Sequence, residues 1–264
     1  MRIALTREIS PLLAQCELTH LDRQPIDLDL ARAQHGAYEA CLAEAGYHVE
    51  RLPAGVDMPD SVFIEDTAVV FPELAIITRP GAASRRHETT AVAAALAASR
   101  RLVHLEPPAT MDGGDVLVVR RSVFVGRSGR TNDEAVAQMS AALREHGYQV
   151  TTVDVRGCLH LKSAVTALAE DVLLVNPAWL PGDAFAAFER VRVHSDEPWG
   201  ANALLVGDHV IYPTSFPRTL DAIARRRIRV RTVEATEVAK AEGAVTCCSL
   251  LFEFVPNESA PTKP

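Results

Sequence analysis

Acidic, imidazole, amide and thiol side chains recur along this chain at intervals of 42 to 48 residues. They stand in five short segments, at Glu65-Asp66, Asp112, His160, Asn202 and Cys247. A cysteine attacks carbon only as its thiolate, so a nucleophilic Cys247 needs an imidazole or a cation nearby, and His160 could supply it. Facing carboxylates repel each other unless a positive group lies between them, which predicts a cationic ligand. A planar guanidinium fits such carboxylates by paired hydrogen bonds better than an ammonium does.

Each of these residues also has an ordinary structural explanation. An isolated cysteine before an apolar run is usually a small core residue, and a lone histidine is usually structural. The run Asp112-Gly-Gly-Asp115 would by itself indicate a turn. What favours a common site is that all of these residues hold the same position within a repeat. Arg85-Arg86 and the segment 127–131 open two predicted helices, where they could hold a substrate carboxylate.

The repeat itself consists of paired apolar strands separated by short polar turns, which is typical of hairpins. The strand pairs are 61–71 with 74–82, 111–119 with 122–131, 160–170 with 171–179, 200–207 with 208–216, and 246–255 with 1–9. The last pair joins the two ends of the chain.

A segment with helical spacing and then a third strand follow each pair. The predicted helices are 29–46, 87–101, 132–147, 182–191 and 219–227, and the third strands are 47–52, 101–106, 148–154, 191–195 and 228–235. In the third helix, a stripe that we expect to be buried consists of Ala135, Met139, Ala142 and Leu143. Asn132 or Thr131 is the expected N-cap of this helix and Gly147 its C-terminal stop.

Five such units closed by pairing of the chain ends predict a five-bladed α/β propeller. We expect one catalytic α/β domain over residues 1–255 and a flexible tail over 256–264, which is polar and rich in proline. An ordinary mixed α/β sandwich is the alternative fold.

The composition of the chain excludes several kinds of binding partner and indicates the cellular compartment. The net charge of −7 argues against a nucleic-acid scaffold or a protein that binds anionic membranes. No apolar run reaches the length of about 18 residues that spans a bilayer, and the first nine residues predict a strand instead of a signal peptide. The five cysteines lack the spacing of a disulfide framework or of a structural zinc site. The sequence therefore predicts a cytoplasmic protein with a thiol free for chemistry.

Six segments resemble the dimethylarginine dimethylaminohydrolases, a family of the guanidine-modifying superfamily of fivefold α/β propellers. They are MPDSVFIEDTAVVF, ITRPGAASRR, MDGGDV, FVGRSGRTN, LHLKS and VTCCS, and the resemblance extends to about residue 255. It implies a hydrolase that converts Nω-methylated arginines to citrulline and a methylamine through a covalent thiouronium on cysteine. It implies no metal and no organic cofactor, although a Cys/His/Asp cluster could bind inhibitory zinc.

The resemblance also assigns roles at the reacting end of the substrate. Cys247 matches the nucleophile, His160 the general acid and base, and Asp112 the acid beside the histidine. Asp66, together with Glu65, matches the acids that bind the guanidinium.

At the amino-acid end of the substrate, Asp60 matches a residue that holds the α-amino group. Arg85 and Arg130 match the arginines that bind the α-carboxylate. Leu18 and Ala241 fall near positions whose backbone carbonyls meet the amine, although Ala241 replaces a larger aliphatic residue.

Other functions stay open at this point. An arginine deiminase would use the same chemistry on unmethylated arginine, and an amidinotransferase would have to exclude water from the intermediate. A propeller that serves only as a binding scaffold would not need these residues in phase. Asn202 could orient a neighbouring catalytic residue or be a plain structural amide. Whether the chain pairs as a homodimer is also open.

Overall fold

Five three-stranded sheets make up the computed structural model, which describes residues 1–256. In each sheet the middle strand is antiparallel to one neighbour and parallel to the other. The sheets are β15–β1–β2 (Leu250–Glu253, Arg2–Arg7, His48–Leu52), β3–β4–β5 (Ala68–Val70, Leu74–Ile77, Arg101–His104), β6–β7–β8 (Val116–Val119, Ser122–Arg127, Gln149–Asp154), β9–β10–β11 (Val165–Ala167, Val172–Val175, Glu189–Arg192) and β12–β13–β14 (Leu204–Val206, His209–Pro213, Arg229–Val233). The five-bladed α/β propeller is therefore confirmed.

Pairing of the two chain ends completes the ring, as predicted. Strand β15 is antiparallel to β1, with Arg2 opposite Glu253 and Leu5 opposite Leu250. This pairing covers edges that would otherwise be open. Of the predicted tail 256–264, only Pro256 lies within the described residues.

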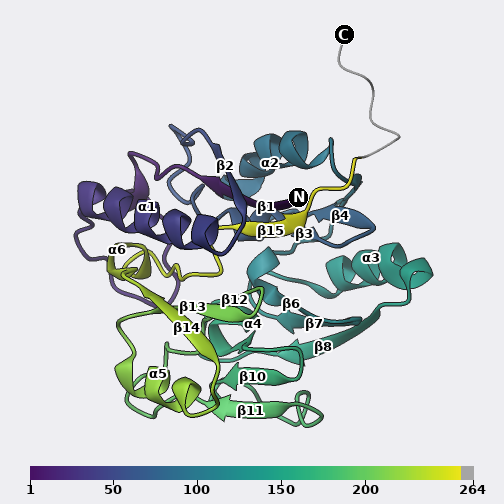
Figure 1. Cartoon of the computed structure of the whole chain (residues 1–264). Helices are drawn as coiled ribbons and strands as arrows, with labels where there is room; N and C mark the ends of the chain where they lie inside the picture. The colour runs from purple at the N-terminus through teal and green to yellow at the C-terminus, as the bar shows by residue number, and fades with distance from the viewer. Residues whose placement is uncertain (257–264) are drawn as a thin grey trace.

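The longer helices lie on the outside of the ring and the strands lie within it (Figure 1). They are α1 (Leu28–Glu44), α2 (Thr89–Leu96), α3 (Asp133–Leu143) and α5 (Pro217–Ala224). Each of these helices connects a middle strand to its parallel third strand, a connection that a tight turn cannot make.

Helix α3 shows why the local sequence forms this element. The Asn132 side chain caps it by accepting a hydrogen bond from the backbone N–H of Ala135. Ala135, Met139 and Leu143 are fully buried against the sheet and Ala142 packs there partly buried, so the predicted stripe is confirmed at three positions and partly at the fourth. Gly147 ends the helical segment in the left-handed conformation at φ 73°, as expected.

The predicted helix at 182–191 is wrong. Residues 184–187 form turns, and β11 begins at Glu189. Gly182 adopts a φ of +86°, which a helix does not allow, and Phe185 packs its ring 4.7 Å from that of Phe124. The fourth blade therefore has turns where the others have a helix. A short helix that was not predicted, α6 (Thr236–Ala239), follows β14.

Within residues 1–256, no helix combines the length and apolar character required to cross a membrane.

Candidate active site

The polar segments singled out above lie just before the innermost strand of each blade, that is, before β3, β6, β9, β12 and β15. Three of them form short helical elements, η2 (Ile64–Thr67), η4 (Gly113–Asp115) and α4 (Leu161–Ala164), and the residues 245–248 form a turn before β15. Hydrogen bonds join neighbouring segments around the axis: Glu65 N to Cys247 O (3.1 Å), Gly114 N to Asp66 Oδ1 (2.9 Å), Leu161 N to Asp115 Oδ1 (3.0 Å), Asn202 Nδ2 to Lys162 O (3.1 Å) and Thr246 N to Asn202 Oδ1 (3.1 Å). Residues far apart in the chain thus meet in one place.

His160 immediately precedes α4, and carboxylates surround its buried ring. Nε2 lies 3.0 Å from Oδ2 of Asp112, and Nδ1 lies 3.9 Å from Oδ1 of Asp66. Burial acts to lower the pKa of His160, but Asp66, Asp112 and Asp115 outweigh it and raise this pKa to about 9. The imidazole is therefore a cation at neutral pH, ready to donate a proton.

Cys247 reaches the same cavity from the turn before β15. Burial raises the pKa of its thiol well above the ordinary value, and the charges of Glu65 and Asp66 raise it further. The resting pair at neutral pH is therefore a thiol and an imidazolium. A thiolate becomes favourable only when positive charge enters beside the sulfur.

Asp66 supplies the negative wall of the pocket. Its Oδ2 accepts a hydrogen bond from Nη1 of Arg85 at 2.7 Å, and its Oδ1 accepts the backbone N–H of Gly114. Although burial acts to raise it, the pKa of Asp66 is lowered to about 2 by His160 and Arg85. This carboxylate stays ionised throughout the physiological range.

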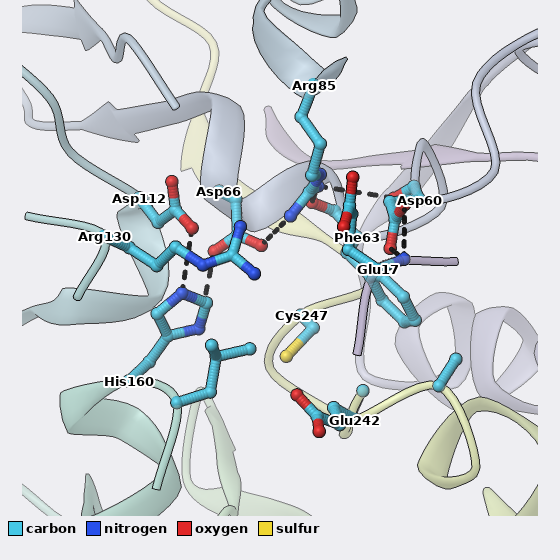
Figure 2. Close-up of a pocket in the computed structure, with 13 residues that line it drawn as sticks. Glu17, Asp60, Phe63, Asp66, Arg85, Asp112, Arg130, His160, Glu242 and Cys247 are labelled. Atoms are coloured by element: carbon cyan, nitrogen blue, oxygen red, sulfur yellow. Dashed lines mark hydrogen bonds and ion pairs between the residues drawn. The ribbon is translucent and has the colours of Figure 1, made fainter. Parts of the chain in front are cut away.

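Most of the predicted site residues line one cavity (Figure 2). Those that do are Asp60, Asp66, Arg85, Asp112, Arg130, His160, Ala241 and Cys247. Leu18 does not line it, although its neighbour Glu17 does. Glu65 does not line it either, but it lines the adjoining cavity described below, together with His160 and Cys247. Its Oε1 pairs with Nζ of Lys162 at 2.5 Å, and its Oε2 accepts the Thr246 hydroxyl at 2.8 Å.

The two arginines predicted to bind the substrate carboxylate differ in how many hydrogen bonds they already donate within the protein. The buried Arg85 donates to Asp66, to Glu88 and to the backbone carbonyls of Asp60 and Phe63. Within the part of the chain that the structure describes, the side chain of Arg130 donates one hydrogen bond, to the Thr19 hydroxyl at 3.1 Å. Arg130 therefore keeps more donors for a ligand than Arg85 does.

Five lining residues escaped the sequence analysis because they stand outside the repeat phase. They are Glu17, Phe63, Leu159, Glu242 and Gly243. A signal was available for four of them, since Phe63 lies three residues before Asp66, Leu159 directly before His160, and Glu242 and Gly243 within six residues of Cys247.

A second, larger cavity of about 230 Å³ adjoins the first, and His160 and Cys247 line both. Its other walls are largely apolar and include Leu21, Trp199 and Phe216. Alkyl groups next to the reacting pair would find room here.

Three ligand atoms in the site could hold a metal ion. The side chains of Asp66, Asp112 and His160 bring theirs within 4.8 Å of one another. A divalent cation there would occupy the imidazole, so it would compete with proton transfer.

Comparisons with known proteins agree with this geometry. Residues 19–195 match a family model described as N,N dimethylarginine dimethylhydrolase, eukaryotic. The chain is 40% identical to the N(G),N(G)-dimethylarginine dimethylaminohydrolase of Streptomyces coelicolor over 94% of this chain and 95% of that one. It is 36% identical to the Pseudomonas aeruginosa protein of the same name over 85% of this chain and 90% of that one.

Solved structures extend the likeness to three dimensions. The Pseudomonas aeruginosa enzyme, as a cysteine-to-serine mutant complexed with citrulline, superposes with a TM-score of 0.90 at 33% identity, covering 94% of this chain and 98% of that one. A histidine-to-glycine variant of a dimethylarginine dimethylaminohydrolase, an adduct with S-methyl-L-thiocitrulline, also gives 0.90, covering 96% of this chain and 100% of that one. The fold, the repeat and these similarities agree that the chain belongs to the dimethylarginine dimethylaminohydrolase family.

Proposed function

We propose that this protein is a dimethylargininase, a hydrolase that converts Nω-methylated arginines to citrulline and a methylamine. The observation that carries the proposal is that a partly buried thiol, a protonated imidazole and the ionised Asp66 line a single cavity. The two relatives named as dimethylarginine dimethylaminohydrolases, at 40% and 36% identity, support the proposal. The adjoining apolar cavity, which has room for N-methyl groups, favours methylated substrates over arginine.

Binding of the substrate starts the chemistry in this proposal. The carboxylate of Asp66 attracts the guanidinium, which keeps its positive charge and its electrophilic carbon near Cys247. That positive charge lowers the pKa of the partly buried thiol, which loses its proton to solvent when the substrate binds. Substrate binding and thiolate formation are therefore coupled.

Two displacements at the guanidinium carbon follow. The thiolate forms a C–S bond, giving a tetrahedral intermediate, and His160 donates its proton to the methylated nitrogen as the C–N bond breaks. The amine leaves and a thiouronium remains on Cys247. His160, now neutral, takes a proton from water, and the resulting hydroxide attacks the same carbon. The C–S bond then breaks, the proton of the new hydroxyl passes to the departing sulfur, and citrulline leaves with the Cys247 thiol and the His160 imidazolium restored.

Outside the reacting atoms, Asp112 is proposed to orient His160, and Asp60, Arg130 and the backbone near Ala241 to hold the amino-acid end. A reducing cytoplasm is the compartment that this mechanism requires, because the thiol of Cys247 must stay reduced.

The test is a citrulline-release assay that offers arginine, monomethylarginine and asymmetric dimethylarginine side by side, with the released amine identified. We expect dimethylamine and citrulline in equal amounts from the dimethylated substrate. Turnover of arginine alone, with ammonia as the amine, would identify a deiminase instead.

A further inference from the structure

Glu242 fastens a loop of the N-terminal region to the wall of the active site. Its Oε1 accepts hydrogen bonds from three successive backbone N–H groups, those of Thr19, His20 and Leu21, at 2.9, 2.5 and 2.7 Å. These residues belong to the loop 16–27, which connects η1 (Leu13–Gln15) to α1. The same loop carries Glu17, which lines the cavity. One carboxylate oxygen thus holds this loop in place.

The other oxygen of Glu242 is left without a donor. Among the residues that the structure describes, Oε2 is buried and has no hydrogen-bond partner. Glu242 lines the cavity together with Cys247 and His160, and its carboxylate lies below Cys247 in Figure 2, on the opposite side of the pocket from Asp66. A buried carboxylate oxygen without a hydrogen-bond donor is costly, so an N–H of a ligand that reaches Oε2 would form a stabilising hydrogen bond there.

The backbone around Glu242 is also unusual. Glu242 adopts a φ of 57°, in the left-handed region that side chains other than glycine, asparagine and aspartate seldom enter. Beside it, a Cβ on Gly243 would lie 2.1 Å from the ring of Phe63, so this ring packs directly on the backbone. An unfavourable conformation that packing maintains next to a reaction centre is typical of functional positions.

A second carboxylate of the pocket holds the same loop. Both oxygens of Asp60 lie 3.2 Å from the backbone nitrogen of Glu17. Two acids that face the cavity, Asp60 and Glu242, therefore fasten the loop on its pocket side, and Arg130 adds a hydrogen bond to the Thr19 hydroxyl at 3.1 Å. A bound cation between them would interact with both.

We propose that Glu242 is a positioning residue that couples binding of the substrate cation to closure of the loop 16–27. Oε1 holds the loop, and Oε2 accepts a hydrogen bond from an N–H of the bound cation. This inference rests on the proposed function, since it takes the cation to be a methylated arginine.

Two variants separate the halves of the proposal. Glu242→Gln keeps a carbonyl oxygen that can accept the three loop N–H groups but loses the negative oxygen offered to the substrate. Glu242→Gly removes both and suits the left-handed backbone, so loss of folding does not obscure the result. Glu237→Gln is the matched control. Glu237 accepts the backbone N–H of Asp27 at 2.8 Å, at the far end of the same loop, and does not line the cavity.

Hydrogen exchange of the Thr19–Leu21 amides and steady-state kinetics are the two readouts. We expect asymmetric dimethylarginine to slow exchange at least tenfold when added to a Cys247→Ser protein, which cannot turn it over. In Glu242→Gln the loop stays protected without ligand, the further slowing is lost, and KM rises about tenfold with kcat little changed. In Glu242→Gly the amides exchange fast even without ligand. Glu237→Gln keeps the wild-type KM.

The outcomes that overturn the inference differ from those that overturn the proposed function. A wild-type KM in Glu242→Gln, with citrulline still released, removes the role of Oε2. Unchanged exchange of the loop amides in Glu242→Gly, which needs no turnover, removes the fastening. If the ligand leaves exchange unchanged in the Cys247→Ser protein, the coupling is wrong. Failure of the wild-type protein to release citrulline is a failure of the proposed function.

Discussion

His160 and Asp112 form a buried pair in which Nε2 of the imidazole lies 3.0 Å from Oδ2 of the carboxylate. The second oxygen of Asp112 accepts the backbone N–H of Gly81 at 2.8 Å, so the carboxylate is held on both sides. An acid fixed in this way stabilises the protonated imidazole and sets the orientation of its ring.

Replacing Asp112 by asparagine removes one of the charges that raise the pKa of His160 to about 9. With that pKa lowered, the imidazole loses its proton at a lower pH, and less of the enzyme can protonate the leaving amine. We expect the alkaline limb of the kcat profile to move to lower pH, and kcat at neutral pH to fall about 10- to 100-fold. Citrulline-release rates measured from pH 6 to 10 test this. An alkaline limb that stays in place would show that Asp112 does not tune the proton donor.

Cys247 and Cys248 are adjacent, and this makes a matched pair of substitutions possible. Cys248 is buried in the core, with Sγ 3.6 Å from the carbonyl oxygen of Ala244, whereas Cys247 lines the cavity. We expect Cys247→Ser to lower kcat by at least about 10³-fold while citrulline still binds, as measured by calorimetry. Cys248→Ser serves as the control and should keep most of the activity. Loss of activity in the Cys248 variant alone would reverse the assignment of the nucleophile.

The pH dependence of thiol alkylation tests the protonation state of the resting site. Because burial, Glu65 and Asp66 raise the pKa of Cys247, its reaction with iodoacetamide should be slow at pH 7 and still increase beyond pH 9. Glu65→Gln removes a negative charge, so it should lower this pKa and speed alkylation at pH 8. Mass spectrometry of the peptide that contains Cys247 separates its reaction from those of Cys16 and Cys41. Slower alkylation in the Glu65 variant would contradict the electrostatic account.

The repeat predicted the ring of blades and its site because residues one repeat apart in the chain occupy equivalent places in successive blades. Residues at 66, 112, 160 and 247 reach one cavity since each stands just before or at the start of an innermost strand. Strand pairing at the termini also followed from the count of units, and β15 lies beside β1.

Side-chain direction could not be predicted in the same way. Glu65 and Asp66 are consecutive in η2, and consecutive side chains diverge, so Asp66 faces the cavity while Glu65 turns to Lys162. The helical composition of 182–191 was overridden by the packing of Phe185 on Phe124. Glu242 lies outside the repeat phase, and its contact with Thr19 joins residues 223 apart in the chain. Only the folded chain brings such pairs together.

The side chain of Asn202 holds Thr246, the residue that precedes Cys247, which supports an orienting role over a purely structural one. Oδ1 accepts the backbone N–H of Thr246 at 3.1 Å, and Nδ2 donates to the Thr246 hydroxyl at 2.9 Å and to the backbone carbonyl of Lys162. Removing these contacts in Asn202→Ala should cost about 1–3 kcal/mol of unfolding free energy and release the Thr246-Cys247 turn. We expect kcat to fall about tenfold or more as the sulfur loses its position.

Asn176→Ala is the matched control for this variant. Asn176 is equally buried and also bonds through both ends of its amide, to the carbonyl of Pro198 at 2.8 Å and the N–H of Ala178 at 3.0 Å, but it lines neither active-site cavity. Both variants should lose similar stability in urea denaturation, and only Asn202→Ala should lose kcat as well. If the two variants retain the same kcat, Asn202 stabilises the fold without positioning Cys247. The loss of stability that both variants share would then be the whole effect of Asn202→Ala.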